Sequence, residues 1–206
     1  DYQLPQNKIT PEPYCATSFL TDRQGNTWVG TLLGGLFKFN KEMELEDHIT
    51  INPDIENCLY CNFIYTLYQC PDGVIWIGTG NEGLWIYDES KNGLIECNLY
   101  INGIPSPYER INNIFKDSFD AYWAGSIIGR GLFYHNPITS EKTEFHHIEQ
   151  DPLSYTDVRD FYEDDNGNLW IITCGEGIYV LTPGNRDSLL FEKFKVSGGS
   201  GNIFRS

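Results

Sequence analysis

Basic residues and long apolar runs are scarce in this sequence, and each shortage excludes a class of function. Lys and Arg number 14 against 29 Asp and Glu, which gives a formal net charge of −15. A surface this acidic repels phosphate backbones and anionic lipids, so nucleic acid is not an expected partner. No apolar run approaches the roughly 20 residues of a membrane span, and the first residues do not form a signal peptide. Direct membrane insertion is therefore not expected.

Methionine is scarce as well, because one Met stands against 12 Phe, 13 Tyr and 5 Trp. This balance favours strands over helices. The 20 Gly and 10 Pro supply many turns. The chain has 206 residues and is 40% hydrophobic, which is enough for a sizeable core. Six irregularly spaced Cys do not fix the redox compartment.

Four tryptophans mark an internal repeat, because Trp28, Trp76, Trp123 and Trp170 lie 48, 47 and 47 residues apart. Each follows an apolar residue nine positions earlier and precedes a Thr or Ser three positions later. Each is also followed after seven or eight positions by a glycine: Gly35, Gly83, Gly131 and Gly177. A catalytic residue need occur only once. We therefore assign the tryptophans and glycines a structural role, with each Trp packed between adjacent sheets.

The repeat predicts an all-β fold made of β-propeller blades. Each unit reads as a strand, an Asp- or Gly-containing turn, the Trp strand, a glycine turn and a third strand, with a more polar fourth strand after it. Four-stranded antiparallel sheets repeated about every 47 residues are typical of propellers. The expected blades are 14–61, 62–108, 109–155 and 156–198. Residues 1–13 are predicted to be the outer-strand remnant of a neighbouring blade and 199–206 the start of a next one, as in an incomplete propeller.

The frame resembles the two-component regulator propeller repeat. Blade one carries it through Asp22, Gly25, Trp28-Val-Gly-Thr and Gly34-Gly35, and blade two through Gly73, Trp76-Ile-Gly-Thr and Gly83. Two positions depart from the frame: Asp120 replaces the turn glycine in blade three, and Ile172 replaces the glycine two residues after the Trp in blade four.

This resemblance implies the extracytoplasmic sensor region of a hybrid two-component regulator of Bacteroidetes. It implies a periplasmic location in an inner-membrane protein, carbohydrate sensing, dimerisation and signal transfer to a histidine kinase. The expected partners are an oligosaccharide ligand, the rest of the parent propeller and a second copy of the protein. The alternatives are a structural or protein-interaction propeller whose ligand binds elsewhere and, more distantly, a propeller glycan hydrolase or lyase.

No catalytic, metal or cofactor motif stands out, so no enzyme activity is expected in this segment. The acidic stretch at 163–168 lacks the spacing of an EF-hand. Cys58 and Cys61 have the spacing of half a zinc knuckle, but no second pair follows at zinc spacing. A local disulfide and two free thiols both remain open for that pair.

Ligand binding is expected where the repeats differ, in the loops that emerge on one face of a propeller. Aromatic rings cover the apolar face of a sugar, and polar side chains bond its hydroxyls. The turns between second and third strands offer Asn81, Glu82, Arg130 and Glu176. The segments entering each first strand add Tyr60, Tyr108, Arg110, Tyr155 and Arg159. In blade four the frame leaves Ile172, Cys174 and Glu176 unexplained.

Overall fold

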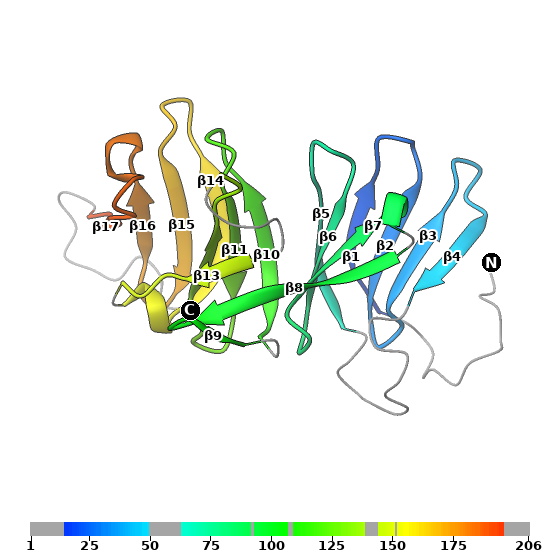
Figure 1. The fold of residues 1–206 in the computed structure, drawn as a ribbon, viewed down its shortest axis with the longest axis horizontal. Helices are drawn as coiled ribbons and strands as arrows, with labels where there is room; N and C mark the ends of the chain where they lie inside the picture. The colour runs from blue at the N-terminus through cyan, green and yellow to red at the C-terminus, as the bar shows by residue number, and fades with distance from the viewer. Residues whose placement is uncertain are drawn as a thin grey trace.

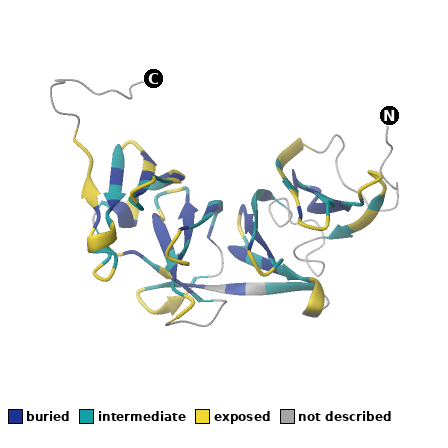
Figure 2. Ribbon diagram, turned by 90° about the horizontal axis from the view of Figure 1, so that it is seen from above, coloured by how far each residue is buried: buried dark blue, intermediate teal, exposed yellow. Residues whose placement is uncertain are grey.

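The computed structural model describes residues 15–49, 63–91, 93–106, 109–138, 144–150 and 152–195. Sheets follow one another along an open arc, seen from the front in Figure 1 and from above in Figure 2. The described residues form no closed ring. The chain is thus all-β, with propeller-like blades. The predicted end pieces, 1–13 and 199–206, lie outside the described residues.

Each blade is a meander of antiparallel strands. The first sheet runs in the order β1 (Cys15–Thr21), β2 (Thr27–Leu32), β3 (Leu36–Phe39) and β4 (Leu45–Ile49). The last runs β14 (Asp157–Glu163), β15 (Leu169–Cys174), β16 (Ile178–Leu181) and β17 (Glu192–Lys193). The register shifts at one place in every first strand, between Ala16 and Ser18 in blade one and between Val158 and Asp160 in blade four. The backbone therefore repeats as closely as the sequence does.

The two middle blades differ from the expected pattern, because they share one nine-stranded sheet. Blade two contributes β5 (Ile64–Gln69), β6 (Ile75–Thr79) and β7 (Leu84–Asp88), and blade three contributes β10 (Ile111–Lys116), β11 (Tyr122–Ser126), β12 (Leu132–His135) and β13 (Glu144–His147). The long strand β8 (Gly93–Ile101) joins them and also pairs with β9 (Ile104–Pro105).

Strand length explains this junction. The nine residues of β8 exceed the five of β7, so the first half of β8 pairs antiparallel with β7. Its second half continues past blade two and pairs in parallel with β13, through residues 98–100 and 144–146. The strand is the long green arrow that crosses between the blades in Figure 1. It covers the outer edge of blade three, which would otherwise present unpaired backbone groups.

The core lies between blades, where the frame residues of one blade meet the first strand of the next. Trp28, Trp76 and Trp123 are at most 3% exposed. The glycine two residues after each Trp permits this contact. A Cβ atom on Gly125 would lie 2.8 Å from Val158 Cγ1. Ile172 stands at that position in blade four and is 41% exposed, because no described segment packs against it as β14 packs against Gly125.

An aspartate fixes the turn between the first and second strands in three blades. Six residues before the Trp, Asp22, Asp117 and Asp164 accept the indole N–H through Oδ2 at 2.8, 2.7 and 2.9 Å. Their Oδ1 atoms accept backbone N–H groups of the same turn. Sequence reasoning did not identify this recurrence, although the spacing is visible in the sequence. Blade two is the exception, because Cys70 occupies the position.

The hydrogen bonds of the Asp164 turn should make the free energy of unfolding depend on pH. Hydrogen bonds from the Asn168 and Trp170 side chains lower the pKa of Asp164 from its usual 3.8 to about 2. These bonds therefore stabilise the fold above pH 4, and their contribution is lost as the pH falls from about 4 toward 2. We expect the difference in unfolding free energy between wild type and Asp164→Asn to shrink over the upper part of that window. Urea unfolding at several pH values measures it. Asp165→Asn is the matched control, because no described residue donates a hydrogen bond to the Asp165 carboxylate in the same turn; equal behaviour of the two variants would contradict the assignment.

Candidate functional site

One end of the strands carries most of the side chains expected to bind ligand. The turns between second and third strands and the segments that enter the first strands meet there, because these strands run antiparallel. We call the cluster formed by Glu109, Arg110, Arg130, Asp157 and Arg159 the arginine rim. Its residues belong to blades three and four, and Arg110 also contacts blade two.

Arg110 links blades two and three. Its Nε donates to the carbonyl oxygen of Gly80 at 3.0 Å, and its guanidinium lies 5.9 Å from the centroid of the Tyr65 ring. The backbone oxygen of the preceding residue, Glu109, accepts the N–H of Gly83 at 2.9 Å. Arg110 is therefore held in place from two sides before any ligand arrives.

Arg130 projects from the turn between β11 and β12. Its Nε lies 3.6 Å from Oε2 of Glu109, and its side chain is 59% exposed against 7% for that of Glu109. The other carboxylate oxygen, Oε1, accepts the Ser106 hydroxyl at 2.6 Å. The contact is loose at 3.6 Å, and only its arginine side is open to solvent. The guanidinium therefore presents further N–H donors to solvent.

Asp157 joins the turn of blade three to the first strand of blade four. Its Oδ2 lies 3.2 Å from Nη2 of Arg159, and its Oδ1 accepts the N–H of Gly129 at 2.7 Å. Tyr155, two residues earlier, is 77% exposed. A carboxylate, a half-exposed guanidinium and an open phenol ring therefore stand within five residues of chain.

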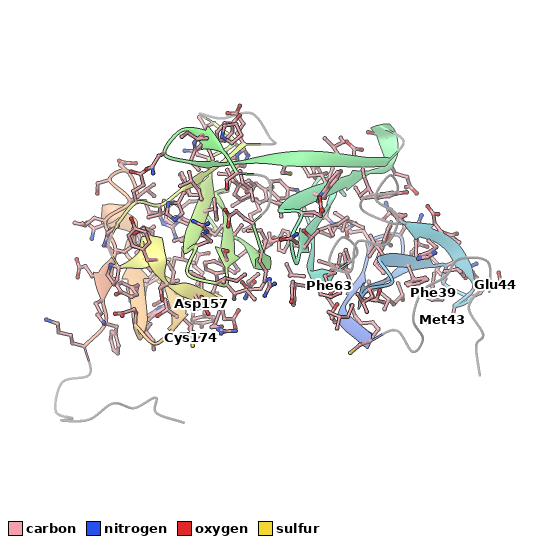
Figure 3. All side chains as sticks on the ribbon, turned by 90° about the horizontal axis from the view of Figure 1, so that it is seen from below. Phe39, Met43, Glu44, Phe63, Asp157 and Cys174 are labelled. Atoms are coloured by element: carbon pink, nitrogen blue, oxygen red, sulfur yellow. The ribbon has the colours of Figure 1, made fainter. Side chains whose placement is uncertain are left out.

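A depression of about 250 Å³ lies beside Arg159. Its walls come from Ile172, Thr173 and Cys174 of β15 and from the glycine turn that follows. Asp157 and Cys174 are paired residues of β14 and β15 and lie side by side in Figure 3. Two of the three positions that the repeat left unexplained, Ile172 and Cys174, thus line the same hollow as a rim arginine.

The remaining expected site residues divide into three groups. Glu176 pairs with Lys193 of β17 at 3.1 Å, so it is drawn toward the outer strand and away from the arginine rim. Asn81 is exposed and Glu82 is half-buried in the turn next to Gly80. Tyr60 and Tyr108 lie outside the described residues, as do Cys58 and Cys61.

Sequence reasoning missed two carboxylates and one ring of this site: Glu109, Asp157 and Tyr65. The signal for the carboxylates was present, since Glu109 precedes Arg110 and Asp157 precedes Arg159 by two. Nothing in the repeat indicated that Tyr65 would lie under a guanidinium from the next blade, because that contact crosses 45 residues of chain.

The described residues include no group of three or more His, Cys, Asp or Glu placed to hold a metal ion. None of their helices is long and apolar enough to cross a membrane. The rim instead offers several N–H donors beside carboxylate acceptors. Such pairs suit hydroxyl groups, which donate and accept at once.

Comparison with known proteins agrees with this architecture. The family described as "Two component regulator propeller" matches residues 152–175, a stretch that contains Tyr155, Asp157 and Arg159. No curated protein matches the chain.

Solved structures share the fold at low sequence identity. The extracellular domain of a hybrid two-component system from B. thetaiotaomicron has a TM-score of 0.68 at 20% identity, over 96% of this chain and 24% of that one. Virginiamycin B lyase from Staphylococcus aureus, solved with quinupristin, has a TM-score of 0.66 at 15% identity, over 96% of this chain and 59% of the lyase. The chain thus spans less than two thirds of either structure. The chain is a β-propeller segment that carries a two-component regulator propeller repeat and shares the fold of part of the extracellular domain of a hybrid two-component system.

Proposed function

We propose that this chain is part of the periplasmic ligand-sensing propeller of a hybrid two-component signalling protein. In this proposal the arginine rim binds a carbohydrate, and the parent protein passes the signal to a histidine kinase. The repeat at 152–175 and the shared fold support the sensor class. The hydrogen-bond donors and acceptors of the arginine rim support a carbohydrate as the ligand.

The observation that carries the proposal is the gathering of three arginines in a chain of net charge −15. Two of them are half-exposed and stand beside a carboxylate, Arg130 beside Glu109 and Arg159 beside Asp157. Each pair offers donors and an acceptor at neighbouring points, which matches a row of sugar hydroxyls. The exposed Tyr155 ring supplies a flat apolar surface of the kind that stacks on a pyranose.

Removing the Arg159 side chain tests the proposal. A glycan array probed with the 206-residue chain identifies a saccharide, and isothermal calorimetry measures its affinity for the variants. We expect Arg159→Ala and Tyr155→Ala each to weaken binding at least about tenfold, because each removes a group that contacts the sugar. Glu176→Ala is the matched control and should bind normally, since Glu176 pairs with Lys193 instead. The absence of any saccharide ligand, or equal losses in all three variants, would contradict a sugar site at the rim.

A structural or protein-interaction propeller is the second candidate. Phe19 is 69% exposed, whereas Ile114 and Phe161 at the same repeat position are 5% and 7% exposed against the preceding blade. Phe19 is therefore suited to contact a further blade, and the chain spans only 24% of the hybrid-system domain it resembles. In this case Arg159→Ala would leave signalling by the parent protein unchanged.

A further inference from the structure

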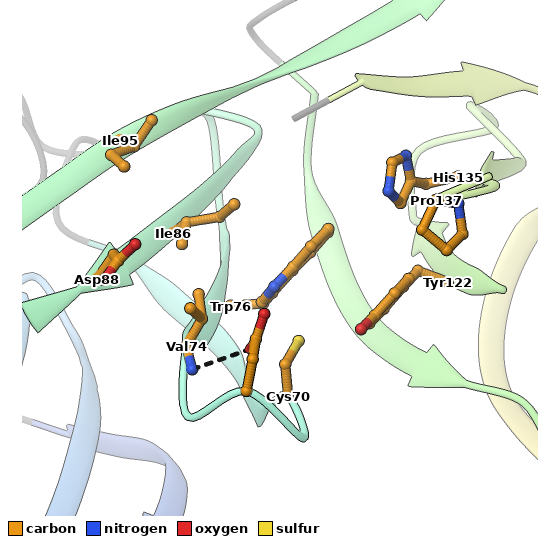
Figure 4. Close-up of a pocket in the computed structure, with 10 residues that line it drawn as sticks. Cys70, Val74, Trp76, Ile86, Asp88, Ile95, Tyr122, His135 and Pro137 are labelled. Carbon is orange, nitrogen blue, oxygen red and sulfur yellow. Dashed lines mark hydrogen bonds between the residues drawn. The ribbon is translucent and has the colours of Figure 1, made fainter. Parts of the chain in front are cut away.

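A second pocket lies between blades two and three, at the opposite end of β6 from the arginine rim. The turn of residues 70–74 borders it, whereas the rim turn of residues 80–83 follows the other end of the strand. The pocket has a volume of about 80 Å³. Its side chains come from five strands and two turns and are drawn in Figure 4.

The substitution of Cys70 for the turn aspartate leaves a polar group without its usual partner. In the other three blades the aspartate accepts the indole N–H. Trp76 is 3% exposed and lines the pocket, and its Nε1–H makes no hydrogen bond within the part of the chain that the structure describes. The indole N–H is therefore available to a hydrogen-bond acceptor that occupies the pocket.

A buried acceptor lines the same pocket. His135 is 1% exposed, and its Nδ1 lies 2.6 Å from the carbonyl oxygen of Glu144. A carbonyl only accepts, so Nδ1 carries the hydrogen. Burial lowers the pKa of His135, which keeps the ring neutral and leaves Nε2 as an acceptor. The described residues provide no donor to Nε2, and Figure 4 shows the His135 ring turned toward the space beside Trp76.

The remaining walls restrict the charge of an occupant. Val74, Ile86 and Ile95 make one side apolar, and Asp72 and Asp88 add carboxylates. An anion would be repelled by both carboxylates. An ammonium group has no lone pair to accept the Trp76 hydrogen. A hydroxyl compound satisfies both ends, because one hydroxyl accepts from Trp76 and another donates to His135.

We propose that this pocket is a binding site for a small neutral polyol. Its volume has room for roughly four to six non-hydrogen atoms, the size of a diol or triol. Tyr122 forms the floor, stacked on Trp76 with ring centroids 4.9 Å apart and planes within 1°. The Tyr122 hydroxyl lies against the Cys70 thiol. Burial is the main cause that raises the pKa of Tyr122, and the contact with Cys70 adds to it, so the hydroxyl keeps its proton. The site does not depend on the arginine rim or on the function proposed for it.

Indole NMR of the ¹⁵N-tryptophan-labelled chain tests the site, with glycerol as the probe. The Trp76 resonance, identified by its loss in Trp76→Phe, should shift saturably with a dissociation constant in roughly the millimolar range. Trp85 serves as an internal control, because its Nε1 already donates to the Glu82 carbonyl oxygen. Acetate and methylammonium should produce no saturable shift. Glucose should produce none either, because it exceeds the pocket.

Three variants complete the experiment. Cys70→Asp supplies the missing acceptor and fills the space, and His135→Asn keeps a donor for Glu144 but removes Nε2. Each should weaken glycerol binding at least about tenfold, whereas Cys70→Ser should retain it. The other four indole resonances report whether each variant is folded. A linear drift of all five wild-type indoles with glycerol would overturn the proposal and leave the pocket to water. A saturable shift with acetate, methylammonium or glucose instead of glycerol would also overturn it.

Discussion

Replacement of Asp117 by alanine should lower the free energy of unfolding by about 3 kcal/mol or more. Asp117 is fully buried as a side chain and forms an ion pair with Arg186, which is 11% exposed. It also accepts the N–H groups of Phe119 and Ala121 and the indole of Trp123. Removing one partner of a buried pair leaves the other charge uncompensated, which typically costs about 3–5 kcal/mol. Urea unfolding, followed by tryptophan fluorescence, measures the loss.

The expected loss lies near the lower end of the range of about 3–5 kcal/mol, because Arg186 keeps other partners when Asp117 is removed. Its Nη2 lies 3.0 Å from Glu163 Oε1 and 3.1 Å from the Gly167 carbonyl oxygen, and its guanidinium lies 4.0 Å from the centroid of the Phe119 ring. These contacts connect the first turns of blades three and four. Asp117 therefore acts between blades as well as within its own turn.

Asp164→Ala is the matched control for Asp117→Ala. Asp164 makes similar bonds to its Trp and turn, but none of the arginines that the structure describes pairs with it. We expect a clearly smaller loss. Arg186→Met added to Asp117→Ala should recover part of the stability, because it removes the stranded charge. If Asp117→Ala costs no more than Asp164→Ala, the arginine contact between the blades contributes nothing.

The fold could be predicted because its information is repeated. A Trp every 47 or 48 residues, with a Gly two positions later in three blades, specifies a strand that packs on the next blade. Every copy of the repeat predicts the same blade structure. The prediction therefore still holds in blade three, where Asp120 replaces the turn glycine. Asp120 adopts the left-handed backbone itself, with φ of 65°.

The β8 junction could not be predicted by the same route. It depends on where one strand stops, and the repeat frame does not specify the outer strand. With five residues, β8 would have ended beside β7. The alternating apolar positions Ile95, Cys97, Leu99 and Ile101 instead continue the strand far enough to reach β13. A pattern shared by blades cannot reveal a contact that only one pair of blades makes.

The candidate site was predictable in part for a related reason. The loops that vary between repeats were identified, and Arg110, Arg130 and Arg159 do lie at one end of the strands. Their partners were not identified, since the pairing of Arg130 with Glu109 depends on how a turn folds back over 21 residues. Cys70 is the clearest missed signal, because it breaks an Asp–Trp spacing that the other three blades keep.

The second large effect is expected at Gly131, in the glycine turn of blade three, where adding a single methyl group should destabilise the fold. Gly131 has φ of 70°, and its N–H donates to the Thr156 carbonyl oxygen at 3.0 Å. A Cβ atom there would overlap the carbonyl oxygen of Leu153 and lie 3.0 Å from the carbonyl carbon of Ser154. Both belong to the backbone that enters blade four. A backbone cannot move aside as a flexible side chain can.

Gly131→Ala should therefore destabilise the chain by about 3 kcal/mol or more, from positive-φ strain and from displacement of the 153–156 segment. Gly177→Ala separates the two causes. Gly177 occupies the same repeat position with φ of 89°, but the nearest atom to its added Cβ is Lys193 Cε at 3.8 Å. It should lose only about 1 kcal/mol, the cost of the backbone conformation. Equal losses in urea unfolding would mean that the contact of Gly131 with blade four does not constrain the fold, whereas a larger loss for Gly131→Ala measures how tightly the two blades are held together.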